Sequence, residues 1–568
     1  MSAHAEAIVT AGLRPELFAD RGAHSISRTL LLVALVALVL GGFVFRARAL
    51  SVEGLADDEL NKLEASMAYR TGGLSGANGE HPFLMKAAIT VSVIAAEKWN
   101  GSGWVRAHSG ELFIPVETAV RLPNVIVGSL TTFLVYLIIS ELFGGEIALL
   151  AAALWAFDPI AIGFNRIAKE DTFLLFFFLL ANIFWLRGQR IAESEPQRDP
   201  TRYYWLTGVA FGAMVASKYL PQYIAISISY YWVFQNIPET RWRLGRLRIL
   251  ILFVVIGVSF AVFNPTIFLP GTWHEILHFA SRKSRDSYEF MGRLYPHEVG
   301  SWFRGLPWYF YGLFFGVKLP LLTLVGFVIG LPLLFRRKLG DGRYFLLFWM
   351  FFWLQFTISG SKFTRYTTFV LPAVYTTAAI GAYYVIRFVA RKIGAAMGND
   401  HVRVLLKTAM AGLLVIFSIL ASESAMPHYR LFTNMLGGGA AKGGAYFTQD
   451  DLYDAEIKPV MKEISSRAKP GAHVLSETPT VCAYYANGAK RSDLRCDSLS
   501  DNVATGGLGD GDYVIAARGR HYLSNDALLS ELARSAKPVF SVPLGDINAA
   551  DVYMLDKSSA ERIKALAH

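Results

Sequence analysis

Hydrophobic runs recur along most of the chain, and each is long enough, at about 17–25 residues, to cross a bilayer as a helix. The first run covers residues 28–45. It is followed by Arg46-Ala-Arg48 rather than by the small residues of a signal-peptide cleavage site, so we predict a retained span. With the last run at residues 404–421, the pattern predicts a mainly α-helical fold, a polytopic membrane helical bundle of about eleven spans.

Short loops between these runs carry most of the Arg and Lys residues. They are residues 187–202, 241–248, 336–343 and 387–403. The positive-inside rule places all four loops in the cytoplasm, so the turns near Lys218, at 264–307 and at 359–365 face outward. If residues 1–27 are a cytoplasmic N-terminal segment, counting spans back from the first basic loop makes residues 46–121 one outer loop.

The outer loop contains two stretches that we predict to lie on the membrane surface. Residues 82–99 are mildly apolar, but a crossing there would move all four basic loops to the outer side. We therefore predict interfacial helices at 82–99 and at 57–70, where Leu60, Leu63 and Met67 share one face.

Composition changes after residue 436, where a Gly-rich sequence predicts a flexible joint. Beyond it, residues 437–568 predict a small α/β domain on the outer, periplasmic side. Helical patterns at 454–466 and 525–536 alternate there with strand-like runs at 473–475, 513–516 and 552–555. This region holds the only two cysteines, Cys482 and Cys496, and both a disulfide and two reduced thiols stay open.

The net charge of +10 does not require a nucleic-acid partner. The cations that produce it lie mainly in the short loops between spans, where they set the orientation in the bilayer. The chain is 53% hydrophobic, which is typical of a membrane protein. We therefore expect the lipid bilayer as a partner and no nucleic acid.

The predicted outer loops gather charged side chains that are costly at a membrane boundary and so indicate a candidate site. A few carboxylates among cations suit a reaction whose leaving group is an anion such as phosphate. Cations stabilise the departing charge, while a carboxylate takes the proton of an incoming hydroxyl. The alternative is structural: the acids cap a helix, and the cations form salt bridges or snorkel. The charged residues are Asp57, Asp58, Glu59, Glu80, Lys86, Arg121, Arg166, Lys169, Asp171, Lys218 and Arg365.

Several short motifs, taken in order, resemble a known family. They are Asp58-Glu59, His81-Pro82-Phe83-Leu84-Met85-Lys86, Arg121-Leu-Pro-Asn, Arg166-x-x-Lys-Glu-Asp171 and Lys362-x-x-Arg365-Tyr366. The set resembles the polytopic glycosyltransferases of the C-type fold that use lipid-phosphate sugars, the protein O-mannosyltransferase and aminoarabinose transferase group. Phe83 departs from the family pattern, which usually has a second proline there.

The resemblance implies a transmembrane glycosyltransferase domain over residues 28–436. Its reaction would be the inverting transfer of a sugar from a polyprenyl-phosphate carrier to a hydroxyl acceptor, which could be a protein, a lipid or a cell-envelope glycan. The site would face the periplasm from a bacterial inner membrane. Asp58 would act as the base and Glu59 as its partner or an acceptor contact, while the extra acid Asp57 leaves the choice of base open. The implied donor-binding candidates are Lys86, Arg121, Arg166, Lys169, Asp171, Lys218 and Arg365.

Two other functions stay open. His274-Glu275-Ile-Leu-His278 could hold zinc in a membrane protease, with Glu289, His297 or Glu298 as the third ligand. In a milder version, Glu80 and one of His274 and His278 hold a divalent metal (zinc, magnesium or manganese) beside the transferase site, as zinc is held in aminoarabinose-type relatives. The second alternative is a non-catalytic or transport protein that binds lipid-linked sugars.

Overall fold

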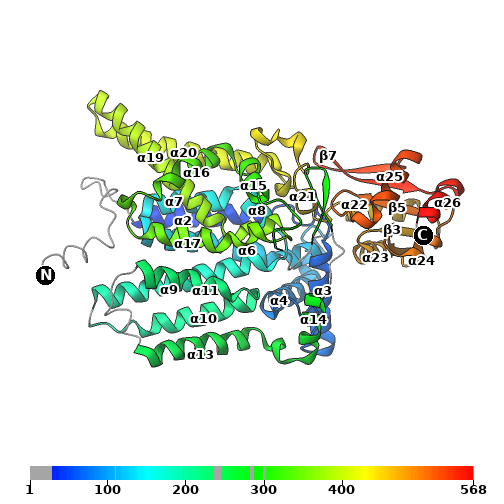
Figure 1. The fold of residues 1–568 in the computed structure, drawn as a ribbon, viewed down its shortest axis with the longest axis horizontal. Helices are drawn as coiled ribbons and strands as arrows, with labels where there is room; N and C mark the ends of the chain where they lie inside the picture. The colour runs from blue at the N-terminus through cyan, green and yellow to red at the C-terminus, as the bar shows by residue number, and fades with distance from the viewer. Residues whose placement is uncertain are drawn as a thin grey trace.

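The computed structural model describes residues 28–108, 110–195, 197–234, 245–281, 287–297 and 302–566. The predicted N-terminal segment 1–27, residues 241–244 of the basic loop 241–248, and Glu298 lie outside these residues. A long helical bundle and a small region that contains a β-sheet lie end to end (Figure 1). The predicted fold class, a mainly helical membrane protein with a small C-terminal α/β region, is confirmed.

Five helices of the described chain are long and apolar enough to cross a membrane, and a sixth span is a bent helix pair. Shorter helices lie alongside them (Figure 1). The protein is therefore a multi-pass membrane protein, and the number of eleven spans stays a prediction. The five are α2 (Arg28–Ala47), α6 (Val116–Phe143), α9 (Glu170–Ser194), α19 (Leu371–Met397) and α20 (Asp400–Ala425), and the pair is α7 (Gly145–Phe157) with α8 (Pro159–Asn165). The shorter helices are α10 (Thr201–Ser217), α11 (Ile224–Phe234), α13 (Gly245–Phe263), α15 (Phe310–Lys318), α16 (Leu321–Leu333) and α17 (Gly342–Trp353).

Arg46 explains how the bent pair is tolerated inside the bundle. The two helices meet at Asp158 with a bend of 59°. Arg46 is fully buried and donates to the carbonyl oxygens of Trp155 and Ala156, at 2.8 and 2.9 Å, just before the break. Because a helix break leaves carbonyl groups without partners in a region that excludes water, this buried arginine satisfies them.

The two predicted surface helices are present as α3 (Asp57–Gly72) and α4 (Phe83–Asn100), and neither is among the candidate spans. Helix α3 lies across one end of the bundle (Figure 1). Its Leu60 and Leu63 are buried, whereas Met67 is 44% exposed, so the buried face is shorter than the predicted one. Helix α4 packs against α6 and α10, which ties the outer loop to the bundle.

The C-terminal sheet has the strand order β4-β3-β5-β7-β6. Strands β3, β4 and β5 are parallel, and β7 runs antiparallel to β5 and β6. The predicted helices at 454–466 and 525–536 are present as α22 and α25, and the predicted strands at 473–475, 513–516 and 552–555 are present as β3, β5 and β7. Strands β4 and β6 were not predicted. Strand β4 is a short, polar edge strand, and β6 contains a proline, so neither has a clear strand pattern in the sequence. The strands are β3 (His473–Ser476), β4 (Arg495–Ser498), β5 (Tyr513–Ala517), β6 (Phe540–Leu544) and β7 (Ile547–Met554), and the helices are α22 (Ile457–Arg467), α23 (Pro479–Gly488), α24 (Asn502–Gly506), α25 (Asp526–Ser535) and α26 (Lys557–Leu566).

The glycine-rich segment around residue 437, where the sequence predicts a flexible joint, forms short 3-10 turns. Asn434 anchors it by donating to the carbonyl oxygens of Gly316 and Leu319 at the end of α15, both at 2.8 Å. The chain then forms α21 (Thr448–Leu452), where Asp451 accepts from Lys318 at 2.7 Å. The start of the predicted outer domain is therefore bonded to the bundle, and a domain boundary at residue 436 stays a prediction.

The two cysteines are free thiols in the structure. Cys482 is buried in α23, and Cys496 is partly buried in β4. Of the two alternatives that the sequence left open, the structure therefore has the reduced pair.

Glu456 gives the C-terminal region a pH-dependent stability. Its side chain is completely buried at the start of α22, and burial together with nearby Asp454 raises the pKa of this carboxyl from its ordinary 4.5 to about 8. Between these values the unfolded carboxyl is ionised and the folded one is neutral, so stability falls as the pH rises. We expect the melting temperature of the wild type to fall from pH 5 to pH 8 relative to Glu456→Gln, and the difference to level off above pH 8. The full difference corresponds to a few kcal/mol.

Glu463→Gln is the matched control for this prediction, because Glu463 is about half exposed on the same helix. Its melting curve should run parallel to that of the wild type from pH 5 to pH 9. A pH-independent offset between Glu456→Gln and the wild type would contradict the assignment.

Candidate active site

A pocket of about 320 Å³ lies where the end of the bundle, α3 and the C-terminal region meet. Segments far apart in the sequence line it together. The lining residues include Asp57, Asp58, Glu80, His81, Lys169, Glu170 and Lys218 from the first half of the chain, then Ser361, Phe363, Arg365 and Tyr366, and finally Gln449, Asp450, Tyr453, Asp454, Arg520 and Tyr522. As the charge pattern predicted, the turns near Lys218 and at 359–365 lie on the same side of the bundle as Asp58.

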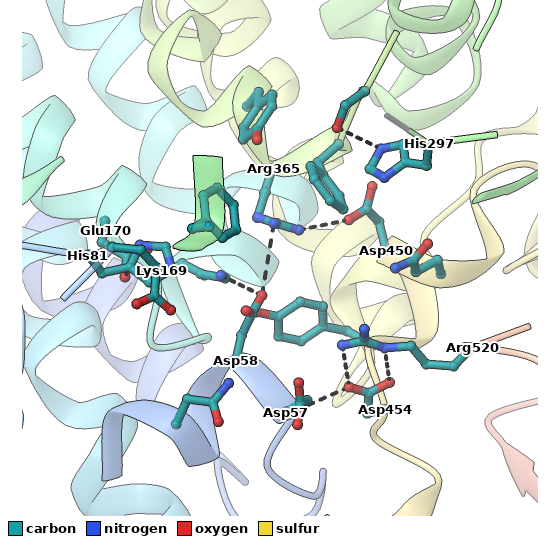
Figure 2. A pocket seen from close by; sticks show the side chains of 18 of the residues that line it. Asp57, Asp58, His81, Lys169, Glu170, His297, Arg365, Asp450, Asp454 and Arg520 are labelled. Atoms are coloured by element: carbon teal, nitrogen blue, oxygen red, sulfur yellow. Dashed lines mark hydrogen bonds and ion pairs between the residues drawn. The ribbon is translucent and has the colours of Figure 1, made fainter. Parts of the chain in front are cut away.

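Asp58 is the carboxylate on which two cations of the pocket, Lys169 and Arg365, converge (Figure 2). It is the second residue of α3, where the positive end of the helix dipole favours an acid. Its Oδ2 atom is ion-paired with Lys169, lies 3.9 Å from Arg365 Nη2 and accepts from Tyr453 Oη at 3.4 Å. The side chain is still 30% exposed, so a ligand in the pocket can reach it.

The surrounding cations keep Asp58 ionised. Burial alone would raise its pKa, but Lys169, Lys62 and Arg365 outweigh burial and hold the pKa of this carboxyl well below its ordinary value. Lys62 is fully buried, 2.9 Å from the Asp58 carbonyl oxygen and 3.1 Å from Glu170 Oε1. Sequence reasoning missed Lys62, although its position four residues after Asp58 on the helix was a usable signal.

Asp57 is adjacent in sequence but faces the C-terminal region. Its Oδ1 accepts from Thr480 Oγ1 at 2.7 Å, and its backbone N–H donates to Asp454 Oδ2 at 3.1 Å. Burial, with Asp454 and Asp58 nearby, raises the pKa of Asp57. The two neighbouring acids therefore differ: Asp58 is paired with cations of the bundle, and Asp57 with a hydroxyl.

The C-terminal region positions the start of α3 through Asp454. This carboxylate caps the helix at Asp57 and is held by Arg520, with Nε–Oδ1 and Nη2–Oδ2 distances of 3.0 Å each (Figure 2). Tyr453 and Asp454 both have left-handed backbone, with φ of 53° and 58°. Two consecutive non-glycine residues in this region are strained, which is typical of functional sites. Nothing in the local sequence identified these residues.

Arg365 is held by α21 of the C-terminal region. Its Nη1 lies 3.4 Å from Asp450 Oδ1, and its guanidinium lies 3.7 Å from the centre of the Phe363 ring. Asp450 also accepts from the Thr364 N–H at 2.6 Å and from Tyr288 Oη at 2.8 Å. Tyr288 belongs to a hairpin of β1 (Ser287–Phe290) and β2 (Arg293–Pro296). The loop that carries Arg365 is thereby fixed at the pocket.

Lys218 and Asp171 form a second ion pair at the pocket, with Nζ and Oδ1 2.6 Å apart. Lys218 lies at the end of α10, and its ammonium sits 4.7 Å from the centre of the Tyr366 ring. It lines the pocket, whereas Asp171 binds it from the adjoining start of α9.

Other predicted site residues lie outside the pocket. Glu59 and Arg121 form a buried two-point ion pair, at 2.9 and 2.6 Å, and Glu59 also accepts from the Ala168 N–H at 2.8 Å. Arg166 donates to the carbonyl oxygens of residue 46, in the last turn of α2, and of residue 49, just after this helix. Lys86 donates to those of residues 77 and 78. These cations bind the backbone of the segment around α3 and so position this helix. They do not line the pocket.

The candidate metal ligands of the described ranges lie partly at the pocket and partly on a separate helix. Glu80 lines the pocket and accepts from Asn78 Nδ2 at 2.7 Å, whereas His274 and His278 are exposed on α14 (Pro270–Ser281) and do not line it. His297 is buried and accepts from the Lys362 N–H at 3.1 Å. Within the described ranges, no group of three or more His, Cys, Asp or Glu side chains could hold a metal ion.

Residues 101–268 match the sequence model of the family described as dolichyl-phosphate-mannose-protein mannosyltransferase. This segment holds Arg121, Arg166, Lys169 and Lys218, so the resemblance that the motifs indicated is confirmed there. No curated protein matches the chain.

Solved structures similar to this chain carry the C-type glycosyltransferase fold. ArnT from Cupriavidus metallidurans bound to undecaprenyl phosphate is 15% identical, with a TM-score of 0.45 over 93% of this chain and 98% of its own. The oligosaccharyltransferase of Archaeoglobus fulgidus is 10% identical, with a TM-score of 0.49 over 86% and 70%. The Pmt1-Pmt2 complex of S. cerevisiae is 17% identical, with a TM-score of 0.34 over 46% and 36%.

Proposed function

We propose that this protein transfers a sugar from a polyprenyl-phosphate carrier to a hydroxyl acceptor, with Asp58 as the base. One observation carries the proposal: an ionised, partly exposed carboxylate shares a pocket with Lys169, Lys218 and Arg365 at the end of a membrane bundle. The family match over residues 101–268, whose description names a dolichyl-phosphate sugar donor, supports a lipid-linked donor.

The cations of the pocket stabilise the leaving group. When the bond between the anomeric carbon and the phosphate oxygen breaks, the electron pair stays on that oxygen, and the carrier phosphate gains negative charge. Lys169 and Arg365 are positioned to stabilise this charge, with Lys218 nearby. A phosphate needs no proton in order to leave, so the reaction requires one base and no general acid.

Asp58 acts on the acceptor hydroxyl as a base. The acceptor oxygen attacks the anomeric carbon from the side opposite the phosphate, and its proton passes to the Asp58 carboxylate. A single displacement of this kind inverts the configuration of the sugar. Glu59, Arg121 and Arg166 do not touch the reacting groups in this proposal; they hold the outer loop so that α3 presents Asp58.

We place the site on the periplasmic side of a bacterial inner membrane, with the N-terminus in the cytoplasm. The distribution of Arg and Lys supports this orientation, because the basic loops at 187–202, 336–343 and 387–403 are separated by spans from the turns that line the pocket.

The direct test incubates the purified protein with a panel of polyprenyl-phosphate sugars and a Ser/Thr peptide, a lipid or a cell-envelope glycan as acceptor. We expect acceptor-dependent release of polyprenyl phosphate and, by NMR, a product of inverted anomeric configuration. No release with any donor, together with movement of a labelled lipid-sugar across proteoliposomes that Asp58→Asn retains, would support a transport protein instead.

A further inference from the structure

The cations that line the pocket from the described part of the chain are already paired with carboxylates. Lys169 and Arg365 contact Asp58, and Arg365 also contacts Asp450. Lys218 contacts Asp171, and Arg520 contacts Asp454. An anionic ligand that enters this pocket must therefore displace a carboxylate before it can bind a cation. The identity of the displaced carboxylate decides how the site responds to its donor.

Burial identifies Asp58 as the carboxylate that can be displaced. The Asp171, Asp450 and Asp454 side chains are 5%, 3% and 1% exposed, and the loss of their cations would leave a buried charge without a partner. The Asp58 side chain is 30% exposed. Water or a hydroxyl acceptor in the pocket can solvate Asp58 once its cations are withdrawn, so its displacement has the smaller cost.

The geometry of the contacts leads to the same residue. Lys169, Arg365 and Tyr453 all approach a single oxygen of Asp58, Oδ2. By comparison, Asp454 uses both oxygens on Arg520 and also caps α3. A rotation of the Asp58 side chain can therefore release Lys169 and the Nη2 group of Arg365 together, while Arg365 stays positioned by Asp450 through Nη1. Asp454, in contrast, has bonds on both oxygens.

We propose that the Asp58 carboxylate occupies the place of the carrier phosphate on Lys169 and Arg365 when no donor is bound, and that the donor phosphate displaces it. This inference rests on the proposed function and adds a regulation of the same site. Without donor, the Asp58 carboxylate neutralises these two cations. When the donor binds, its phosphate takes the place of this carboxylate beside them. The base and the leaving-group site are thereby coupled through Lys169.

Displacement by the donor phosphate explains how Asp58, which is paired with two cations, can act as a base. While Lys169 and Arg365 contact Asp58, they hold its pKa well below the ordinary value, and it is a weak proton acceptor. Once these cations turn to the phosphate, the carboxylate gains basicity. Asp58 is thus activated when the leaving group is in place.

The test measures binding of undecaprenyl phosphate to the full-length protein in nanodiscs. Asp58→Asn keeps the shape of the side chain but removes the internal competitor, so we expect about ten-fold tighter binding than in the wild type. Asp57→Asn removes the same charge from the same pocket, but the Asp57 side chain accepts from Thr480 and is not the ion-pair partner of Lys169 or Arg365. We expect its affinity for undecaprenyl phosphate to change by less than about two-fold. Binding of the uncharged undecaprenol should be equal in all three proteins.

A double-mutant cycle shows whether the effect passes through Lys169. In a Lys169→Gln background, Asp58→Asn should gain clearly less affinity than it does in the wild-type background. Equal or weaker binding of undecaprenyl phosphate by Asp58→Asn overturns the inference, as does an equal gain in Asp57→Asn or an absence of binding in every variant. A gain in Asp58→Asn with no sugar transfer by the wild type would instead refute only the proposed transferase activity.

Discussion

Replacing Asp58 with Asn is expected to slow sugar transfer at least about a hundred-fold, the usual contribution of a general base. The amide is isosteric with the carboxylate but cannot take the acceptor proton. Single-turnover release of polyprenyl phosphate at saturating donor is the appropriate measurement. Under these conditions the tighter carrier binding expected for this variant does not limit the observed rate.

Asp57→Asn is the matched comparison, since the two acids are neighbours on α3 and line one pocket. Its loss should be smaller than about ten-fold, because the Asp57 carboxylate contacts Thr480 and no cation of the phosphate group. A large loss in Asp57→Asn with a small loss in Asp58→Asn would identify Asp57 as the base.

Replacing Arg121 with Met is expected to destabilise the folded protein by about 3–5 kcal/mol. Both partners of this ion pair are almost fully buried, and Arg121 also donates to three carbonyl oxygens of the chain before α3. Its removal leaves an uncompensated Glu59 carboxylate and unpaired backbone groups. Thermal unfolding in detergent, followed by size-exclusion chromatography, measures the loss.

Two further variants control this prediction. Arg190→Met breaks an ion pair with Glu141 in which the arginine is 58% exposed, so the change should be at most about 1 kcal/mol. Arg121→Met combined with Glu59→Gln should recover part of the stability, because no buried charge is left alone. If Arg121→Met kept its stability but lost binding of undecaprenyl phosphate, Arg121 would be a phosphate ligand as the sequence motifs implied.

Much of the framework of the site could be predicted without the structure. The period of apolar residues located α3 and α4, and the charge of the basic loops excluded a span at 82–99. The same charge pattern placed Lys218 and Arg365 on the side of Asp58, and all three line one pocket. These predictions succeeded because each depends on sequence periodicity or on the number of spans between two points.

The roles of individual cations could not be predicted in this way. Lys86, Arg121, Arg166 and Lys169 are all cations of the charged motifs in the predicted outer loops, so the sequence did not distinguish them. In the structure the first three bind backbone carbonyl groups or a buried acid, and of these four only Lys169 lines the pocket. A charged residue in an outer loop has many partners within reach. Only the folded chain decides whether its partner is a structural group or an exposed carboxylate.

The sequence by itself determined that the chain is a membrane bundle with charged side chains gathered at one end, because hydrophobic period and loop charge act over short stretches of chain. Only the tertiary structure decided that the C-terminal region contributes Tyr453, Asp454 and Arg520 to the pocket. These residues lie hundreds of positions after Asp58, and no local pattern encodes a contact that forms only when distant segments pack together.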